Sequence, residues 1–217
     1  MEFPHPPAPA SAAIDALVRR DPDFAGILAR AGPLPWRTRA RGFPGLLQAI
    51  VAQMISNQAA AAIWGRLRAT PGALEPVSLL DLPDEPLRAA GLSRPKVVHA
   101  RALASAFIDG TLDANRLDAM DDAAAVALIA SVKGLGRWTA EVYLLFAHDR
   151  LDIFPIGDIA LAAAAADLKG LAARPDPKAL GVLAEAWSPG RSLAARLLWH
   201  HWRHVTGRPA LDDFPVA

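Results

Sequence analysis

The sequence predicts a mainly α-helical fold, from three observations. Apolar residues recur at helical spacing in most segments of the 217-residue chain, and neither strand-like alternation nor an internal repeat interrupts them. Hydrophobic residues make up 53% of the chain, as in a folded globular protein. A Gly-x-Gly connection at residues 134–136 lies between two apolar, Ala-rich stretches, as a tight turn between helices would.

Composition excludes several kinds of chemistry. The chain has no cysteine, so it forms no disulfide, no cysteine-ligated zinc or iron–sulfur site and no thiol nucleophile. Its formal net charge of +1 neither supports nor excludes binding to nucleic acid, because such binding needs only a local basic face. No apolar run reaches the roughly 20 residues of a membrane span, and the N-terminus does not resemble a signal peptide. We therefore expect a soluble, cytoplasmic chain with no membrane partner.

The N-terminal third predicts short helices and a basic loop. The first ten residues are rich in proline, and we expect no regular structure there. Apolar spacing predicts one or two helices over residues 13–32, and the Pro- and Gly-rich segment 33–45 that follows is a loop carrying Arg37, Arg39 and Arg41. Residues 43–69 have a helical period with a polar cluster in the middle, Gln53, Ser56, Asn57 and Gln58. This cluster predicts a break between two helices.

The rest of the chain predicts further helices with recognisable ends. Residues 71–91 hold several prolines and only short apolar groups. A helix is expected over residues 93–110, with Gly110 as its stop, and a second begins after a cap at Asp121 or Asp122. Three more are expected from Arg137 to about His148, from Asp158 to near Gly170, and over residues 191–205.

The Gly-x-Gly connection can bind an anion. A helix that starts directly after a tight turn leaves its first backbone N–H groups without intrahelical partners, and the helix dipole adds positive potential there. Gly134 and Gly136 have no side chains, so a phosphate could approach the backbone closely. Such a contact positions a nucleic-acid strand without reading its sequence. The alternative is that the two glycines only end one helix and permit the turn.

A resemblance extends this interpretation. Residues 132–161, VKGLGRWTAEVYLLFAHDRLDIFPIGDIAL, are similar to the hairpin, following helix and catalytic loop of the helix-hairpin-helix DNA glycosylases, most of all to the alkylpurine (3-methyladenine type II) branch. Segments 49–67, 91–104 and 187–202 extend the similarity. The resemblance implies an all-α, two-lobed helical bundle with a helix-hairpin-helix motif and the active site in the cleft between lobes. Residues 43–150 would form one lobe, and 11–42 with 151–217 the second, without the additional N-terminal β domain of some members.

The resemblance also implies a catalytic carboxylate and a base pocket. The family's aspartate falls on Asp158, which equally suits an N-cap; the two roles are compatible, and the nearby Asp149 and Asp152 are expected to be solvated. Trp138 corresponds to a pocket tryptophan that would stack on a cationic purine, or else it is a core residue. Val142 and Gly190 stand where a family member has a tyrosine and a second tryptophan, so the pocket is less aromatic.

Further roles follow from the same resemblance. Met54, after Gln53, would be the wedge that fills the space left by an extruded base, although methionine at helical spacing is commonly a core residue. The resemblance assigns DNA-phosphate binding to Lys133, Gly134, Gly136, Arg137 and Thr139. A monovalent cation held by carbonyls near Val132 would fit the family, and no other cofactor is expected. We interpret His200, His201 and His204 as helix-end or surface residues and expect no metal site.

The implied activity is base-excision repair by a monofunctional DNA glycosylase. Trp138 stands where bifunctional members have a lysine nucleophile, so the resemblance implies hydrolysis that leaves an abasic site. An N3- or N7-alkylated purine is already cationic, so a single carboxylate could suffice. The expected partner is double-stranded DNA containing damaged bases, bound by a monomer. The alternatives are a glycosylase for an oxidised or deaminated base and a non-catalytic helix-hairpin-helix DNA-binding module.

Overall fold

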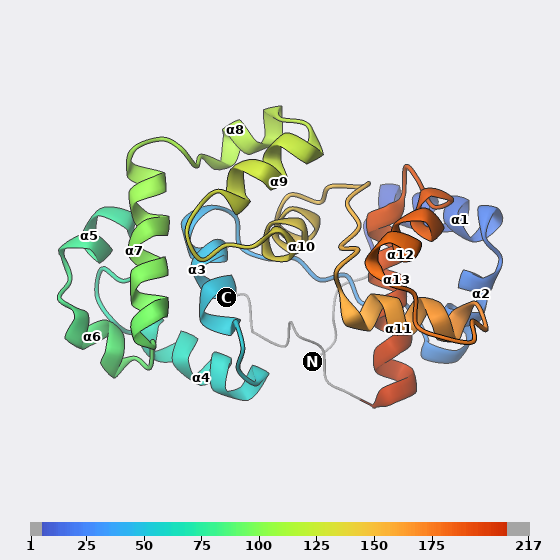
Figure 1. The fold of residues 1–217 in the computed structure, drawn as a ribbon, viewed down its shortest axis with the longest axis horizontal. Coiled ribbons are helices and arrows are strands. Elements are labelled where there is room, and N and C mark those ends of the chain that lie inside the picture. Colours follow the sequence, from blue (N-terminus) through green and yellow to red (C-terminus); the bar gives the residue numbers. More distant parts are fainter. Residues whose placement is uncertain (1–5, 208–217) are drawn as a thin grey trace. The chain divides into compact units, whose positions relative to one another are not determined.

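The computed structural model describes residues 6–207, and within them it contains thirteen α-helices and no strand (Figure 1). The predicted all-α class is therefore confirmed. The described residues form two compact units: unit 1 comprises 6–37 and 149–207, and unit 2 comprises 38–148. The predicted second lobe extends to residue 217, and its residues 208–217 lie outside the described part of the chain.

Unit 1 is built around its last helix. Its helices are α1 (Ala8–Arg20), α2 (Asp23–Ala31), α11 (Ile159–Leu168), α12 (Pro177–Glu185) and α13 (Arg191–Thr206). Helix α13 packs against α1, α2 and α11 (Figure 1). The buried indole of Trp187 contacts the rings of Phe24 and Phe154, with centroids 5.4 and 5.5 Å away. Its Nε1 donates a hydrogen bond of 2.7 Å to Asp21, so the polar atom of this large core residue is satisfied.

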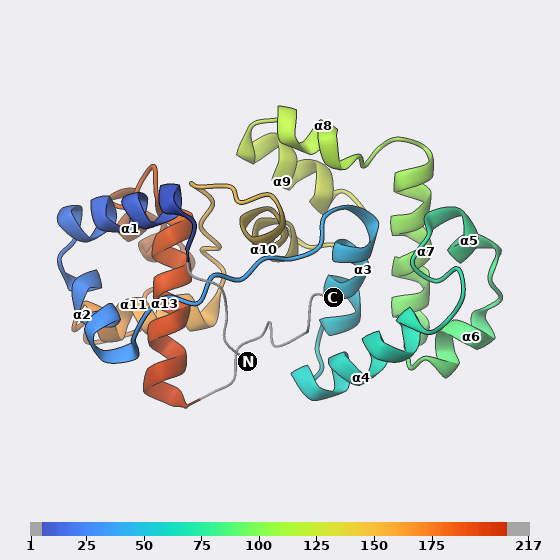
Figure 2. The ribbon, with the colours of Figure 1, turned by 180° about the vertical axis from the view of Figure 1, so that it is seen from behind.

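Unit 2 is built around α10. Its helices are α3 (Gly42–Ala52), α4 (Asn57–Arg68), α5 (Pro76–Asp81), α6 (Asp84–Ala89), α7 (Arg94–Ile108), α8 (Ala114–Ala119), α9 (Asp122–Ala130) and α10 (Arg137–Ala147). Helix α10 packs against α3 and α9, and α7 packs against α3 and α5 (Figure 2). All residues of α10 from 139 to 147 are buried. Such burial on every face is typical of a central helix.

Most predicted helix ends are confirmed. Helix α3 stops at Ala52, and the hydroxyl of Ser56 caps α4 by accepting a hydrogen bond from the Ala59 amide, so the polar cluster is a break between two helices. Asp121 caps α9. Gly110 has a φ of +77° just after α7, as a helix stop requires.

The expectation of irregular structure over the first ten residues was wrong for residues 8–10. Helix α1 begins at Ala8, within the stretch expected to be irregular, because Pro9 lies in the first turn, where a missing N–H costs no hydrogen bond. Segment 71–91 forms the short helices α5 and α6. Pro76 is the first residue of α5, so this proline begins a helix instead of preventing one.

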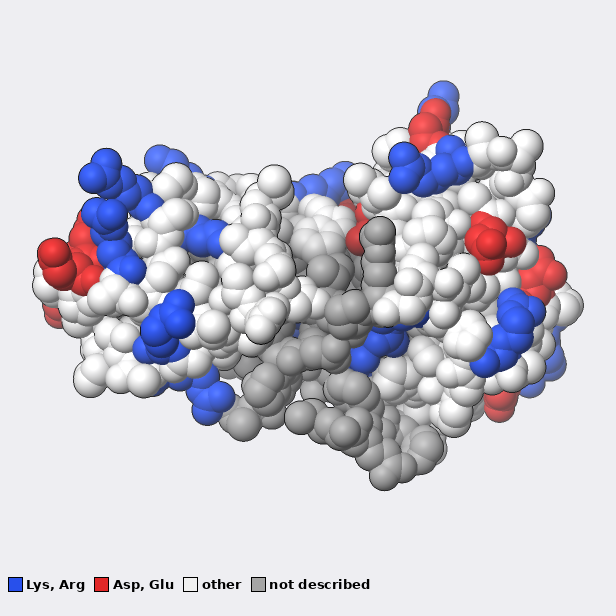
Figure 3. All heavy atoms as spheres, turned by 90° about the horizontal axis from the view of Figure 1, so that it is seen from below, with Lys and Arg blue, Asp and Glu red and all other residues white. Residues whose placement is uncertain are grey.

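Charge is dispersed on the face in Figure 3, where Lys and Arg side chains form small separate groups on a mostly uncharged surface. Any electrostatic attraction from this face is therefore local. Within residues 6–207, no helix combines the length and the apolar character that a membrane span needs.

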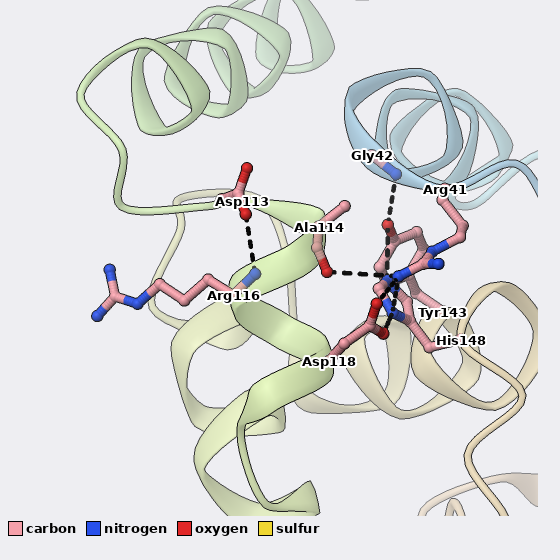
Figure 4. A network of polar contacts seen from close by, with 8 residues as sticks. All are labelled: Arg41, Gly42, Asp113, Ala114, Arg116, Asp118, Tyr143 and His148. Carbon is pink, nitrogen blue, oxygen red and sulfur yellow. Dashed lines mark hydrogen bonds and ion pairs between the residues drawn. The ribbon is translucent and has the colours of Figure 1, made fainter.

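A polar network holds the end of α10 within unit 2 (Figure 4). The side chain of His148 is fully buried, and its Nδ1 lies 2.7 Å from a carboxylate oxygen of Asp118 on α8. Arg41, just before α3, pairs with the same carboxylate. The Tyr143 hydroxyl accepts a hydrogen bond of 2.8 Å from the amide of Gly42, and burial raises the pKa of Tyr143 to about 12. The network joins the start of α3, α8 and the end of α10.

Candidate active site and DNA-contact elements

The hairpin between α9 and α10 is closed by one backbone hydrogen bond, from the Leu135 amide to the Val132 carbonyl at 3.0 Å. Gly136 is the N-cap of α10, and no side chain caps this helix. The first turn of α10 therefore presents backbone N–H groups without a capping side chain, as an anion-binding helix start requires. The Val132 carbonyl, predicted near a monovalent cation, keeps one lone pair after accepting the Leu135 amide.

The two hairpin glycines differ in backbone conformation and in the space around them. Gly134 has a φ of +94°, and a Cβ built on it would lie 2.7 Å from Nδ1 of His99 on α7, well inside van der Waals contact. Gly136 has an ordinary φ of −86° and open space where a Cβ would stand. Gly134 is therefore required by the turn and its packing, whereas the space beside Gly136 remains available to a ligand.

The residues predicted to bind phosphate lie at different depths. Lys133 is exposed, and so is the Arg137 side chain, which retains 73% of its surface. The guanidinium Nε of Arg137 donates a 2.7 Å hydrogen bond to Glu141, one turn later and 5% exposed. Burial raises the pKa of Glu141, and Arg137 opposes that shift. Thr139 is buried, so the prediction for Thr139 depends on its backbone amide.

The predicted pocket residues on α10 differ in exposure. Trp138 is 38% exposed, so the alternative of a wholly buried core tryptophan does not apply. Val142 lies one turn further along α10 and is buried at 2% exposure. Of this pair, Trp138 is therefore the residue that retains exposed surface.

The loop between α3 and α4 exposes an apolar tip. Met54 is fully exposed and has a φ of +58°, which is rare for a residue other than glycine. The alternative that Met54 is a core residue is therefore wrong. Nε2 of Gln53 donates a 2.9 Å hydrogen bond to the carbonyl of Gly134, so this loop is bonded directly to the hairpin.

Asp158 caps α11 in unit 1, as predicted. One carboxylate oxygen accepts a 2.8 Å hydrogen bond from the Leu161 amide, and the residue is 6% exposed. The cap fixes the carboxylate at the start of a helix, where the dipole stabilises negative charge.

The two neighbouring acids are engaged elsewhere in unit 1. Arg191 donates to both carboxylate oxygens of Asp152, and Ser188 adds a further hydrogen bond. Burial raises the pKa of Asp152, but these bonds outweigh it and leave the pKa below its ordinary value. Asp149 lies 3.3 Å from the guanidinium of Arg196. The expectation that both acids are solvated was wrong for Asp152, which is bonded and largely shielded.

A family model described as "HhH-GPD superfamily base excision DNA repair protein" matches residues 47–189, which include the Met54 loop, the hairpin and Asp158. The chain belongs to the HhH-GPD superfamily. DNA-3-methyladenine glycosylase 1 of Schizosaccharomyces pombe is 27% identical over 158 residues, which cover 71% of this chain and 69% of that protein. These matches confirm the resemblance to the 3-methyladenine branch.

Solved structures extend the likeness of this HhH-GPD chain over most of its length. A DNA-3-methyladenine glycosidase from Bacillus halodurans is 30% identical, with a TM-score of 0.80 over 90% of this chain and 91% of that one. The S. pombe 3-methyladenine DNA glycosylase in complex with abasic DNA is 25% identical, with a TM-score of 0.77 over 88% and 95% of the two chains.

The three histidines of α13 in this HhH-GPD chain differ in burial. His200 and His201 are buried, so the expectation that they lie at the surface was wrong for these two, whereas His204 is exposed as expected. Nε2 of His200 lies 3.1 Å from the Gly32 carbonyl, and Nε2 of His201 lies 2.7 Å from a carboxylate oxygen of Asp167. Within residues 6–207, no group of three or more His, Cys, Asp or Glu side chains is placed to hold a metal ion.

Sequence reasoning missed three residues that support these elements: Lys96, His99 and Glu141. Lys96 and His99 stand one turn apart on α7, and Glu141 follows Arg137 by one turn on α10. The spacing of Arg137 and Glu141 could have indicated an ion pair. No local signal indicates the α7 contacts, because their partners lie more than thirty residues away in sequence.

Proposed function

We propose that this protein is a DNA glycosylase of base-excision repair that hydrolyses the N-glycosidic bond of alkylated purines and leaves an abasic site. The observation that carries the proposal is the occurrence, in an HhH-GPD chain, of an uncapped helix start at Gly136, an exposed apolar tip at Met54 and a helix-capping carboxylate at Asp158. The 3-methyladenine glycosylases among its relatives support alkylated purines, such as 3-methyladenine and 7-methylguanine, as the substrate class.

Each element has one task in the proposed reaction. The first amides of α10, with Lys133 and Arg137, bind a backbone phosphate without reading sequence. Met54 enters the base stack when the damaged nucleotide is extruded, and Trp138 offers an electron-rich face to the cationic base. The exposure of Met54, Trp138, Lys133 and Arg137 supports these assignments.

Asp158 would act on the sugar. A cationic alkylpurine departs without being protonated, so the remaining requirement is to stabilise positive charge on the deoxyribose or to orient water. A carboxylate supplies this stabilisation, and the hydrogen bond from the Leu161 amide fixes its position. Asp152 and Asp149 pair with Arg191 and Arg196, and we assign them no role in the proposed reaction.

The reaction would be hydrolytic. Trp138 occupies the position at which bifunctional relatives have a lysine nucleophile, and an indole cannot form an imine with the sugar. The proposed partner is double-stranded DNA containing a damaged base, bound by a single copy of the chain.

The experiment that tests the proposal compares duplexes that each carry one lesion. Purified protein is incubated with 3-methyladenine, 7-methylguanine, 8-oxoguanine and uracil duplexes, and abasic sites are scored after mild alkali. Release of the two alkylated bases supports the proposal. Release of only the oxidised or deaminated base would replace the substrate class, and binding without release from any duplex would leave a DNA-binding module.

A further inference from the structure

The Met54 tip is held in a strained conformation. Its positive φ costs free energy in a residue other than glycine, and its fully exposed side chain recovers none through burial in the free protein. Such a conformation persists only where the surrounding structure imposes it. The bonds on each side of Met54 therefore identify what holds the tip in place.

Three polar contacts anchor the loop. Before the tip, Nζ of Lys96 donates a 2.7 Å hydrogen bond to the Val51 carbonyl in the last turn of α3. At the end of that helix, Gln53 donates to the Gly134 carbonyl at 2.9 Å. After the tip, the Ser56 hydroxyl caps α4. The contact from Gln53 differs from the other two because its acceptor belongs to the hairpin.

One turn of α7 braces both elements. Lys96 supports the end of α3, and His99, three residues later, packs so closely on Gly134 that no Cβ could be accommodated. Burial lowers the pKa of Lys96, in keeping with a partly desolvated ammonium group. The hairpin and the Met54 loop thus share one support, and the Gln53 amide joins them directly.

We propose that Gln53 is a positioning residue that couples the phosphate-binding hairpin to the Met54 wedge. When the hairpin binds the DNA backbone, the Gln53 hydrogen bond fixes the position from which the wedge inserts. This inference rests on the proposed function and changes the role expected for Gln53 from substrate contact to coupling. The hydrogen bond fixes the end of α3 at the residue before Met54. Without it the hairpin still binds phosphate, but the tip loses its defined position relative to the strand.

The coupling matters only when the damaged base must be extruded from a paired stack. Extrusion costs considerably more free energy for a paired base than for one that is already unpaired. Loss of the Gln53 bond should therefore reduce base release from a paired lesion and spare release from an unpaired lesion. A general structural defect would reduce both alike.

The test is single-turnover base release by Gln53→Met, which keeps the side-chain length and removes the donor. The substrates are 7-methylguanine opposite cytosine and the same lesion in a one-nucleotide bulge. We expect about a tenfold loss with the paired lesion and a change within about twofold with the bulge, consistent with loss of one hydrogen bond. Gln58→Met, an exposed glutamine on α4, is the matched control and should resemble the native chain on both substrates.

A double-variant cycle separates coupling from direct contact with DNA. If Gln53 acts through Met54, adding Gln53→Met to Met54→Ala should cause no further loss on the paired lesion. Equal losses on both substrates, no loss on either, or full additivity in the cycle would overturn the inference. If Gln53→Met does not fold, as judged by thermal unfolding, Gln53→Ala replaces it. A native protein that releases no base from any duplex refutes the proposed function, which is a result distinct from these.

Discussion

The carboxylate of Asp158 lies 2.8 Å from the amide of Leu161, so the proposed catalytic group is also the cap of α11. The same bond that starts the helix also fixes the direction of the carboxylate. The capping role and the proposed catalytic role therefore depend on one geometry. A conservative amide at this position preserves the first role and removes the second.

The hairpin glycines should separate stability from DNA binding. Gly134→Ala should lower the free energy of unfolding by about 1–3 kcal/mol, because φ is +94° and the new methyl group would meet His99. Gly136→Ala should cost less stability than Gly134→Ala, because φ is ordinary at Gly136, and it should weaken binding to damaged and undamaged duplexes alike, since its methyl group would enter open space at the start of α10. Denaturant unfolding and fluorescence anisotropy measure the two effects. Unchanged affinity in Gly136→Ala would reduce this glycine to a turn residue.

Borohydride should trap no covalent adduct between the native protein and lesion DNA, because the proposed reaction forms no imine. Lys133 is exposed on the hairpin and is the lysine close enough in sequence to Trp138 to challenge this expectation. Lys133→Gln should lower DNA affinity and its salt dependence while the product remains an intact strand with an abasic site. An adduct that disappears in this variant would show that the protein is a lyase.

The ionised carboxylate of Asp118 should stabilise the fold except at acidic pH. Hydrogen bonds from His148 and then Arg41 lower the pKa of Asp118 below its ordinary 3.8. A lowered carboxyl pKa adds stability that is present above the unfolded-state value and is lost as pH falls through the folded-state value. Asp118→Asn should lower the unfolding free energy at pH 6 by about 1 kcal/mol or less, because the carboxylate is half exposed. The difference should shrink below about pH 4, and a difference independent of pH would contradict this account.

Glu141 should have the opposite pH dependence. Burial raises its pKa above 4.5, so the stability associated with its neutral form is lost as pH rises through the folded-state value. The stability of Glu141→Gln relative to the native chain should therefore improve as pH increases from about 4 toward 7. Thermal unfolding at a series of pH values checks the trend, with Glu185→Gln as the control at an exposed glutamate. A relative stability that falls with increasing pH would show that the Arg137 ion pair outweighs desolvation.

The sequence predicted the features that depend on neighbouring residues. Asp121 and Asp158 cap helices because a carboxylate reaches the amide three residues later, a relationship visible in the sequence itself. The break around Ser56 was predicted from the cluster of polar residues there, which is also a local feature of the sequence. The order of wedge segment, hairpin and aspartate followed from resemblance and not from local pattern.

Contacts between distant residues could not be predicted in this way. The packing of His99 on Gly134, the bond from Gln53 to the hairpin and the pairing of Asp118 with His148 each join segments at least thirty residues apart. The burial of His200 and His201 depends on which neighbours α13 acquires, and the local composition gave no sign of it. These tertiary contacts decide which predicted residues lie at the surface.

The most direct test of the central claim is base release by Asp158→Asn, measured in single turnover on a 3-methyladenine or 7-methylguanine duplex beside binding to a duplex with an abasic-site analogue. Asparagine is also a good N-cap, so the fold and its stability should change little. We expect base release to fall by about a thousandfold or more, because stabilisation of the sugar cation is lost, while affinity for the abasic analogue stays within about threefold. Retained base release, or a loss of binding in proportion to activity, would contradict the role assigned to Asp158.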